Sequence, residues 1–236
     1  VNLGSPSSLV LTLSDAIASG TATIADFEVK MAGTLLIGTD YGTSANAKWW
    51  GGVLAGNGRI YAIPDGMTQV LKIDPTDDST TLIGDTYAGT TKYLGGVLAT
   101  NGKIYACPKK AAQVLKIDPT DDTTSLVGTD YGTTVWKWAD GAMAYTGMLY
   151  CAPYNKDQVL KINPTDDTTS LVGTTYSGGD AAWVGATLAT NGMIYMVPAK
   201  SAAKVLKLNP VDDTTSLVGS SYGDGTKLKW FGSVLA

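Results

Sequence analysis

Asn101 to Gly128 reads NGKIYACPKKAAQVLKIDPTDDTTSLVG, and close copies of this stretch recur along the chain. Each copy ends in Leu-Ile-Gly or Leu-Val-Gly, and the closing glycines lie 44 to 46 residues apart. These glycines are Gly38, Gly84, Gly128, Gly173 and Gly219. The opening Asn-Gly-x-Ile-Tyr recurs at 57–61 and 191–195, with a variant at 146–150. A fixed period of this length indicates a repeat architecture.

Each repeat contains four short apolar runs separated by turn signals. In the first repeat the runs are residues 51–55, 59–63, 70–73 and 80–83. Asn57-Gly58 predicts a two-residue hairpin of type I′, in which both central residues need positive φ. The segment Asp-Pro-Thr-Asp-Asp predicts a type I turn, because Pro fixes φ at the second position. We therefore expect four-stranded antiparallel units that are apolar on both faces.

Units of this length that cannot bury both faces alone are typical of β-propeller blades. The Gly-rich run is expected innermost, where blades converge and bulky side chains would collide. Residues 230–236 repeat that run, and residues 9–13, 26–31 and 34–37 can supply three further strands. The sequence thus predicts an all-β, single-domain, five-bladed β-propeller over residues 1–236, closed by the C-terminal innermost strand pairing with N-terminal strands. The expected blades are 230–236 with 1–38, 48–84, 92–128, 137–173 and 182–219.

The N-terminal part leaves an alternative open. It lacks both Asn-Gly-x-Ile-Tyr and the Asp-Pro turn, so residues 1 to about 25 could instead form an arm that docks on another subunit. The two alternatives differ in whether this segment completes the fifth blade. Oligomeric state stays open at this point.

Asn-Gly-x-Ile-Tyr followed by an apolar strand and an Asp-Pro turn resembles the repeats of kelch, NHL and quinoprotein-like propellers. The resemblance implies the architecture and no particular activity. A proline replaces the kelch glycine doublet after the second strand, and the Gly-His and Trp-Asp pairs of WD repeats are absent. In chain length, blade number and blade length the protein is similar to tachylectin-type five-bladed lectins, whose near-equal sites bind amino sugars. That similarity is one of size and fold only.

Composition limits the classes of function. The 236 residues suffice for one large domain. The net charge is −4 with no Lys/Arg cluster, so nucleic acid and anionic membrane surfaces are not expected partners. No apolar stretch approaches 18 residues, so we expect no membrane insertion, and no signal peptide is recognised. Cys107 and Cys151 lie in strand-like apolar runs and are expected to be small buried side chains, with a disulfide as the alternative.

The residue types argue against an enzyme. The chain has no histidine, which removes Ser-His-Asp and Cys-His nucleophiles and His-containing metal sites. Asp pairs recur in the hairpin turn, but equivalent exposed turns lack the unlike environments that a catalytic pair needs. We expect solvated turn residues there, with weak calcium binding as the alternative. No catalytic residue, metal or cofactor is therefore predicted, although an enzyme that uses the central channel is a further alternative.

Strand direction assigns the diverse second connection of each repeat, such as residues 109–112, to one variable-loop face. A Tyr three residues after each closing Gly, an aromatic residue before each innermost strand and a preceding Lys recur on that face. The predicted ligand-binding residues are Tyr41, Lys48, Trp49, Tyr87, Lys92, Tyr93, Tyr131, Lys137, Trp138, Tyr176, Trp183, Tyr222, Lys229 and Trp230. Aromatic faces pack on sugar rings and polar tips bind sugar hydroxyls.

The repeated set predicts a non-enzymatic, multivalent, lectin-like module that binds carbohydrate. In the alternative interpretation the same aromatics only pack between blades, and the protein is a structural or protein-interaction propeller without a small-molecule ligand. For either function we favour an extracellular or surface-exposed location.

Overall fold

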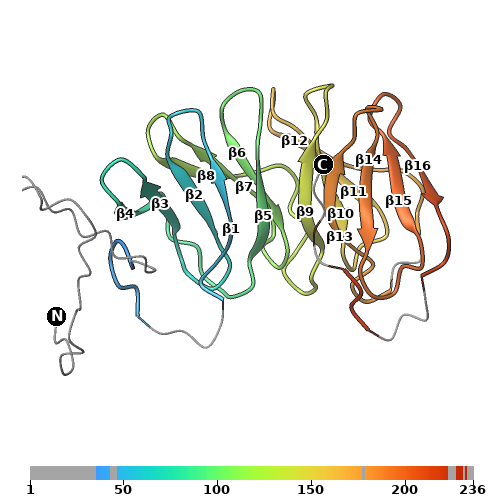
Figure 1. Cartoon of the computed structure of the whole chain (residues 1–236), viewed down its shortest axis with the longest axis horizontal. Helices are drawn as coiled ribbons and strands as arrows, with labels where there is room; N and C mark the ends of the chain where they lie inside the picture. Colours follow the sequence, from blue (N-terminus) through green and yellow to red (C-terminus); the bar gives the residue numbers. More distant parts are fainter. Residues whose placement is uncertain (1–35, 43–46, 177–178, 223–226, 231, 233–236) are drawn as a thin grey trace, which may run out of the picture. The chain divides into compact units, whose positions relative to one another are not determined.

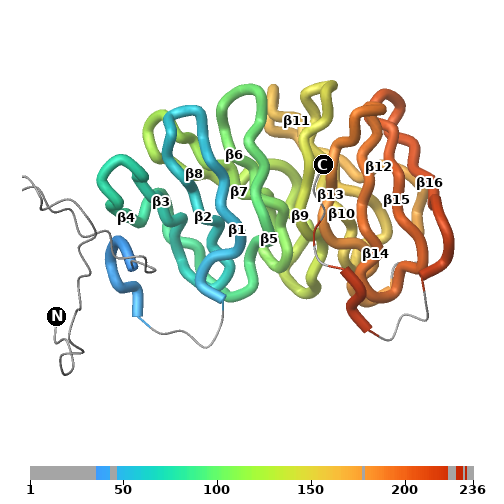
Figure 2. The backbone as a smooth tube through the Cα atoms, in the orientation of Figure 1, coloured from blue at the N-terminus to red at the C-terminus, as the bar shows by residue number. Residues whose placement is uncertain are grey.

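The computed structural model describes residues 36–42, 47–176, 179–222, 227–230 and 232. Within these residues the chain forms four antiparallel sheets of four strands, each built from consecutive strands (Figure 1). The trace completes one sheet before it enters the next (Figure 2). The all-β class and the four-stranded blades are confirmed. Residues 37–236 form one unit, which contains every contact discussed below, and residues 1–36 form another, of which only Leu36 is described.

The strand bounds follow the repeat. Blade 1 contains β1 (Trp49–Leu54), β2 (Ile60–Pro64), β3 (Val70–Asp74) and β4 (Ser79–Ile83). Blade 2 contains β5 (Tyr93–Leu98), β6 (Ile104–Pro108), β7 (Val114–Asp118) and β8 (Thr123–Val127). Blade 3 contains β9 (Trp138–Met143), β10 (Leu149–Pro153), β11 (Val159–Asn163) and β12 (Thr168–Val172). Blade 4 contains β13 (Trp183–Leu188), β14 (Ile194–Pro198), β15 (Val205–Asn209) and β16 (Thr214–Val218).

The Asn-Gly hairpin differs from the predicted type I′ turn. Only Gly58 has a positive φ, of 79°, while the Ala55 carbonyl accepts from the Gly58 amide at 3.0 Å. Asn57 contributes to this hairpin through hydrogen bonds of its side chain and not through a positive φ. Its Oδ1 accepts from the Arg59 amide, and its Nδ2 donates to the Pro119 carbonyl of the next blade at 2.8 Å. The hairpin therefore both turns the chain and contacts the neighbouring blade.

The hydrophobic core lies between successive blades. Tyr61 and Ile63 of β2, for example, pack in one cluster with Ile104 of β6 and Leu115 of β7, and all four are buried. Full burial of such a side chain contributes about 1.5 to 3 kcal/mol. Because blades 2 and 3 each pack against a neighbour on both faces, their strands read as continuous apolar runs in the sequence.

The second Asp of the turns in blades 2, 3 and 4 is a contact between blades, which corrects the expectation of freely solvated turn residues. Its carboxylate accepts from the repeat Tyr hydroxyl of the preceding blade and pairs with a Lys of that blade. The hydroxyl bonds are Tyr61 to Asp122 at 3.0 Å, Tyr105 to Asp167 at 2.8 Å and Tyr150 to Asp213 at 2.7 Å. The first Asp does cap its own turn, as where Asp121 Oδ1 accepts from the Thr123 amide. We call the Tyr-Asp-Lys contact the latch.

Cys107 and Cys151 form a disulfide between blades 2 and 3, so the expectation of free thiols is wrong. Both are buried as predicted. Cys107 lies two residues after its repeat Tyr and Cys151 one residue after, and adjacent strand residues point to opposite faces. The two side chains therefore face each other across the interface, with their Cα atoms 6.0 Å apart.

The predicted closing strands are residues 9–13, 26–31, 34–37 and 230–236, and they lie outside the described residues except for residues 36, 37, 230 and 232. The blade count is therefore not part of the observed fold. None of the described segments is a helix long and apolar enough to cross a membrane.

Candidate functional site

The predicted tyrosines reach from one blade to the next. Four of them precede a described blade, and the hydroxyl of each is bonded to a threonine in the outer strand of that blade. The bonds are Tyr41 to Thr80 at 3.2 Å, Tyr87 to Thr124 at 2.9 Å, Tyr131 to Thr169 at 3.1 Å and Tyr176 to Thr215 at 3.2 Å. The same threonine oxygen accepts a backbone amide two residues before the Tyr, as where Asp85 donates to Thr124. This contact closes the outer part of each junction.

The predicted tryptophans lie directly against these tyrosines. Trp49, Trp138 and Trp183 are the first residues of β1, β9 and β13. Their indole Nε1 atoms donate to backbone carbonyls before the third strand, at 3.0, 2.9 and 2.9 Å respectively. Each ring also meets a predicted Tyr edge-on, with centroids 4.9 to 5.6 Å apart. The structure thus brings the Tyr and Trp series together at the junctions before blades 1, 3 and 4.

The predicted lysines are turned inward. Lys92 donates to the carbonyls of Asp65 at 3.0 Å and Gly89 at 2.8 Å, and Lys137 makes the equivalent bonds within blades 2 and 3. Lys48 and Lys229 also donate to loop carbonyls. Burial lowers the pKa of Lys92, and burial followed by repulsion from Lys156 lowers the pKa of Lys137 to about 8.

These contacts give the repeated set a structural role between blades, and its ligand-binding role stays a prediction. Tyr222 and Trp230 differ from the other members in being 46% and 44% exposed. Their rings still meet edge-on at 5.3 Å. The Tyr-Trp contact therefore persists after blade 4.

Blade 2 has a tyrosine, Tyr93, where the other repeats have tryptophan. Tyr93 has no indole N–H, so the carbonyl of Gln113, which corresponds to the acceptor in the other blades, does not receive this bond. Within the described part of the chain no group hydrogen-bonds to the Tyr93 hydroxyl. The smaller ring also fills less of the junction. A cavity lies beside it.

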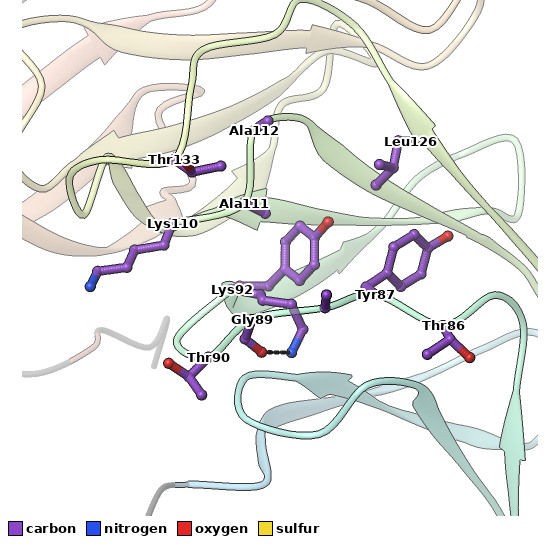
Figure 3. Close-up of a pocket in the computed structure, with 12 residues that line it drawn as sticks. Thr86, Tyr87, Gly89, Thr90, Lys92, Lys110, Ala111, Ala112, Leu126 and Thr133 are labelled. Carbon is purple, nitrogen blue, oxygen red and sulfur yellow. Dashed lines mark hydrogen bonds between the residues drawn. The ribbon is translucent and has the colours of Figure 1, made fainter.

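This cavity, the Tyr93 pocket, has a volume of about 370 Å³ (Figure 3). The β4–β5 loop, the β6–β7 loop, β8 and the loop after β8 supply its walls. The lining residues are Thr86, Tyr87, Ala88, Gly89, Thr90, Lys92, Tyr93, Lys110, Ala111, Ala112, Leu126 and Thr133. Three predicted site residues, Tyr87, Lys92 and Tyr93, therefore share one pocket.

The pocket combines hydroxyl groups and apolar surface with two lysines, Lys92 and Lys110. Three threonines line it, and no carboxylate is among the described lining residues. Figure 3 shows Lys92 bent toward the Gly89 carbonyl, which accepts its ammonium group. Burial raises the pKa of Tyr87 and of Tyr93, so both hydroxyls stay protonated at neutral pH. Tyr87 already donates its proton to Thr124 and can only accept from a ligand, whereas the Tyr93 hydroxyl can donate as well. The pocket suits a ligand that both donates and accepts hydrogen bonds.

Sequence reasoning missed the threonines, Lys110 and Leu126, because they lie in loops and in an outer strand that it treated as scaffold. The sequence did contain one signal for the position of the pocket. Tyr93 is the only non-tryptophan in its series of five, and that departure marks the junction with the pocket.

No family model matches this sequence, and no curated protein matches it. Solved structures do. A streptogramin B lyase aligns with TM-score 0.58 and 16% identity over 70% of this chain and 52% of its own. A catalytically inactive variant of virginiamycin B lyase from Staphylococcus aureus, with quinupristin, aligns with TM-score 0.59 and 13% identity over 75% and 58%. The extracellular domain of a one-component system from B. thetaiotaomicron aligns with TM-score 0.55 and 12% identity over 79% and 26%.

These comparisons establish the fold. The chain is a β-propeller with four-stranded antiparallel blades, similar to virginiamycin B lyase and NHL-type propellers at low identity. It spans at most about three-fifths of the length of these proteins. Because they include both lyases and an extracellular receptor domain, the shared fold selects no function.

Proposed function

We propose that the protein is a non-enzymatic binding module that holds a carbohydrate or similar neutral polyol in the Tyr93 pocket. The supporting observation is the Tyr that replaces Trp at this junction. It opens a cavity and leaves a phenol hydroxyl and a backbone carbonyl without the bonds made elsewhere. A sugar hydroxyl both donates and accepts, so it can bond to the Tyr93 hydroxyl, which belongs to a residue that lines the pocket.

The other lining groups support a neutral ligand. The threonine hydroxyls can bond to further sugar hydroxyls, while Tyr87, Leu126 and the alanines offer apolar surface to the ring carbons. The volume of about 370 Å³ lies at the lower end of the range for small-molecule sites. No carboxylate is among the described lining residues, so the pocket offers no counter-ion to a cation. The ammonium group of Lys92 is engaged by backbone carbonyls, and that of Lys110 can donate to a further sugar hydroxyl.

The sequence predicted several similar binding sites, whereas this proposal has one principal site. At the junctions before blades 1, 3 and 4 the indole occupies the space and bonds to the carbonyl. Near-equal sites there would require those indoles to move. We therefore expect a stoichiometry of one sugar per chain, in place of one per blade.

Two matched variants test the site. Tyr93→Trp installs the residue of the other junctions, and should fill the pocket and weaken sugar binding at least tenfold. Trp183→Tyr makes the opposite change in blade 4 and should leave binding at the Tyr93 pocket unchanged. Glycan-array screening, followed by calorimetric titration with the best monosaccharide, measures both.

Two results would refute the proposal. One is no sugar binding by the parent protein at tens of millimolar. The other is undiminished binding by Tyr93→Trp in a protein that remains folded by circular dichroism. Either result would favour the structural or protein-interaction alternative.

The non-enzymatic part of the proposal rests on the residue types. The chain has no histidine, whereas the S. aureus lyase variant described as catalytically inactive is one in which a histidine is replaced by alanine. The recurring carboxylates are engaged in turns and latches. A lyase reaction of that kind would need different groups here.

We also propose an extracytoplasmic location. Structural disulfides persist in oxidising compartments and are rare in the cytosol. The Cys107–Cys151 disulfide is buried in a blade interface, where it serves packing rather than redox exchange.

We also propose that a fifth blade closes the ring of the propeller. The Thr39 amide and the Tyr41 hydroxyl both contact Thr80 of blade 1, as the end of a preceding blade would. The Lys229 amide donates to the Ala199 carbonyl, as at the start of a following blade. Deletion of residues 1–25 should then lower the Tm markedly. An unchanged Tm with an altered oligomeric state would support the docking arm instead.

A further inference from the structure

A second cavity, of about 230 Å³, lies between the innermost strands of the blades. It shares no lining residue with the Tyr93 pocket. Each of β1, β5, β9 and β13 contributes to it, together with one residue that follows Trp230. The lining residues are Trp50, Gly51, Leu94, Gly95, Asp140, Val184 and Gly232. We call it the inner-strand cavity.

Asp140 stands where every other repeat has a glycine. The equivalent glycines are Gly51, Gly95, Gly185 and Gly232, and all have positive φ. Asp140 does not share that backbone conformation. Its carboxyl lies over Gly95 of the adjacent strand, so closely that a Cβ at Gly95 would collide with it. The repeat thus provides a space that only blade 3 uses for a charged side chain.

The Asp140 carboxylate is poorly satisfied. Its hydrogen-bond donor in the described structure is the Gly141 amide, at 2.9 Å, and no described cation lies within ion-pair distance. The nearby lining residues Leu94 and Val184 are apolar. Burial raises the pKa of Asp140, an effect that the Gly141 amide only partly offsets. A carboxylate in such surroundings is stabilised when a positive partner arrives.

Trp50 forms a partly exposed aromatic wall of the same cavity, at 38% exposure. The Lys109 ammonium lies 5.2 Å from the centre of its ring and 4.2 Å from that of Trp136. Lys109 is itself paired with Asp65 at 3.5 Å, and both are buried. Because this charge is neutralised within the cluster, Asp140 is the charge that lacks a partner among the described residues that line the cavity.

We propose that the inner-strand cavity binds the ammonium group of a compact organic amine, with Asp140 as its counter-ion and Trp50 as an apolar wall. An ammonium group donates hydrogen bonds that the second carboxylate oxygen can accept. The ligand's hydrocarbon part packs against Leu94, Val184 and the indole. A calcium ion would need several oxygen ligands, and the described residues contain no cluster of three metal-binding side chains.

Isothermal titration with butylamine and benzylamine tests the site, with butan-1-ol and benzyl alcohol as neutral isosteres. The parent protein should bind an amine at least tenfold more tightly than the matching alcohol. Asp140→Asn and Asp140→Gly should each lose at least tenfold of that affinity. Glycine is the residue of the other repeats, so the second variant is expected to fold. Asp85→Asn, which removes an exposed carboxylate, is the charge-matched control and should bind normally.

Equal affinity for amine and alcohol, or undiminished binding by both folded Asp140 variants, would overturn the proposal. Saturable binding of calcium chloride that the Asp140 variants abolish, without amine binding, would overturn it as well. Tyr93→Trp should leave amine binding intact. This site and the sugar site therefore succeed or fail separately.

Discussion

Removal of the Cys107–Cys151 disulfide should destabilise the protein by an amount that follows from its position. The bridge joins residues 44 apart in sequence, and in the chain-entropy treatment closure of a loop of that length stabilises the folded state by about 4 kcal/mol. With a urea m-value of about 2 to 3 kcal/mol/M, the unfolding midpoint should fall by about 1.3 to 2 M.

The neighbouring interfaces supply variants that remove the bond while preserving the packing. At the same position between blades 1 and 2, Ile63 and Ala106 lie in one buried cluster. Between blades 3 and 4, Ala152 and Met196 do so. Cys107→Ile/Cys151→Ala and Cys107→Ala/Cys151→Met therefore copy two pairings that the fold already uses. Both double variants should lose the entropic stabilisation that the disulfide provides, while they keep most of the packing at the interface.

Urea unfolding of the parent protein and both double variants, followed by intrinsic fluorescence, measures the effect. Both cysteines are 1% exposed, so the reduced parent must be prepared by unfolding with dithiothreitol and then refolding. The reduced parent should match the double variants. A parent midpoint that is unchanged by reduction, or double variants as stable as the oxidised parent, would refute the loop-closure reasoning.

Three further variants test the junctions by urea unfolding. Asp167→Ala removes the acceptor of the Tyr105 hydroxyl, and it places alanine at a φ of 60° that aspartate tolerates better. It should lower the free energy of unfolding by about 2 to 3 kcal/mol. Asp118 bonds to Lys103 and its own turn, and these bonds outweigh burial and lower its pKa to about 2. Its contribution is present above pH 4 and lost toward pH 2, a dependence that Asp118→Asn should reduce. Gly128→Ala at φ 75° should cost about 1 to 3 kcal/mol. A cost below about 0.5 kcal/mol for either alanine variant, or an unchanged acid dependence, would contradict these assignments.

The repeat made the strands predictable, because period, turn residues and apolar runs all favour the same four-stranded unit. The predicted run 70–73, for example, is β3 at Val70–Asp74. The turn at Asn57 was predicted wrongly because its side chain bonds to another blade, and such contacts have no local signature. The latch was missed for the same reason, since an Asp in a turn sequence carries no mark of the Tyr about 60 residues away.

The candidate site was predictable in its components and not in its location. Sequence periodicity identified Tyr87, Lys92 and Tyr93, but it weighted all five junctions equally. Whether an aromatic residue fills a junction or borders a pocket depends on the difference in size between Trp and Tyr and on one indole N–H. That difference acts through the carbonyl of Gln113 and the loops of two blades, which only the folded chain brings together.

Departures from the repeat gather in blades 2 and 3, at Tyr93, at the two cysteines and at Asp140. A repeat chain is most stable when each junction uses the common packing, so buried departures require a separate reason. For the cysteines the reason is stability itself. For Tyr93 and Asp140 it is not, because one leaves a cavity and the other leaves a carboxylate without a described positive partner.

Function commonly costs stability at the residues that provide it. Tyr93→Trp and Asp140→Asn should therefore raise the Tm as they abolish sugar and amine binding respectively. Differential scanning calorimetry of the two variants checks this. A lower Tm in either would show that the departure serves packing, and that site would lose its strongest support.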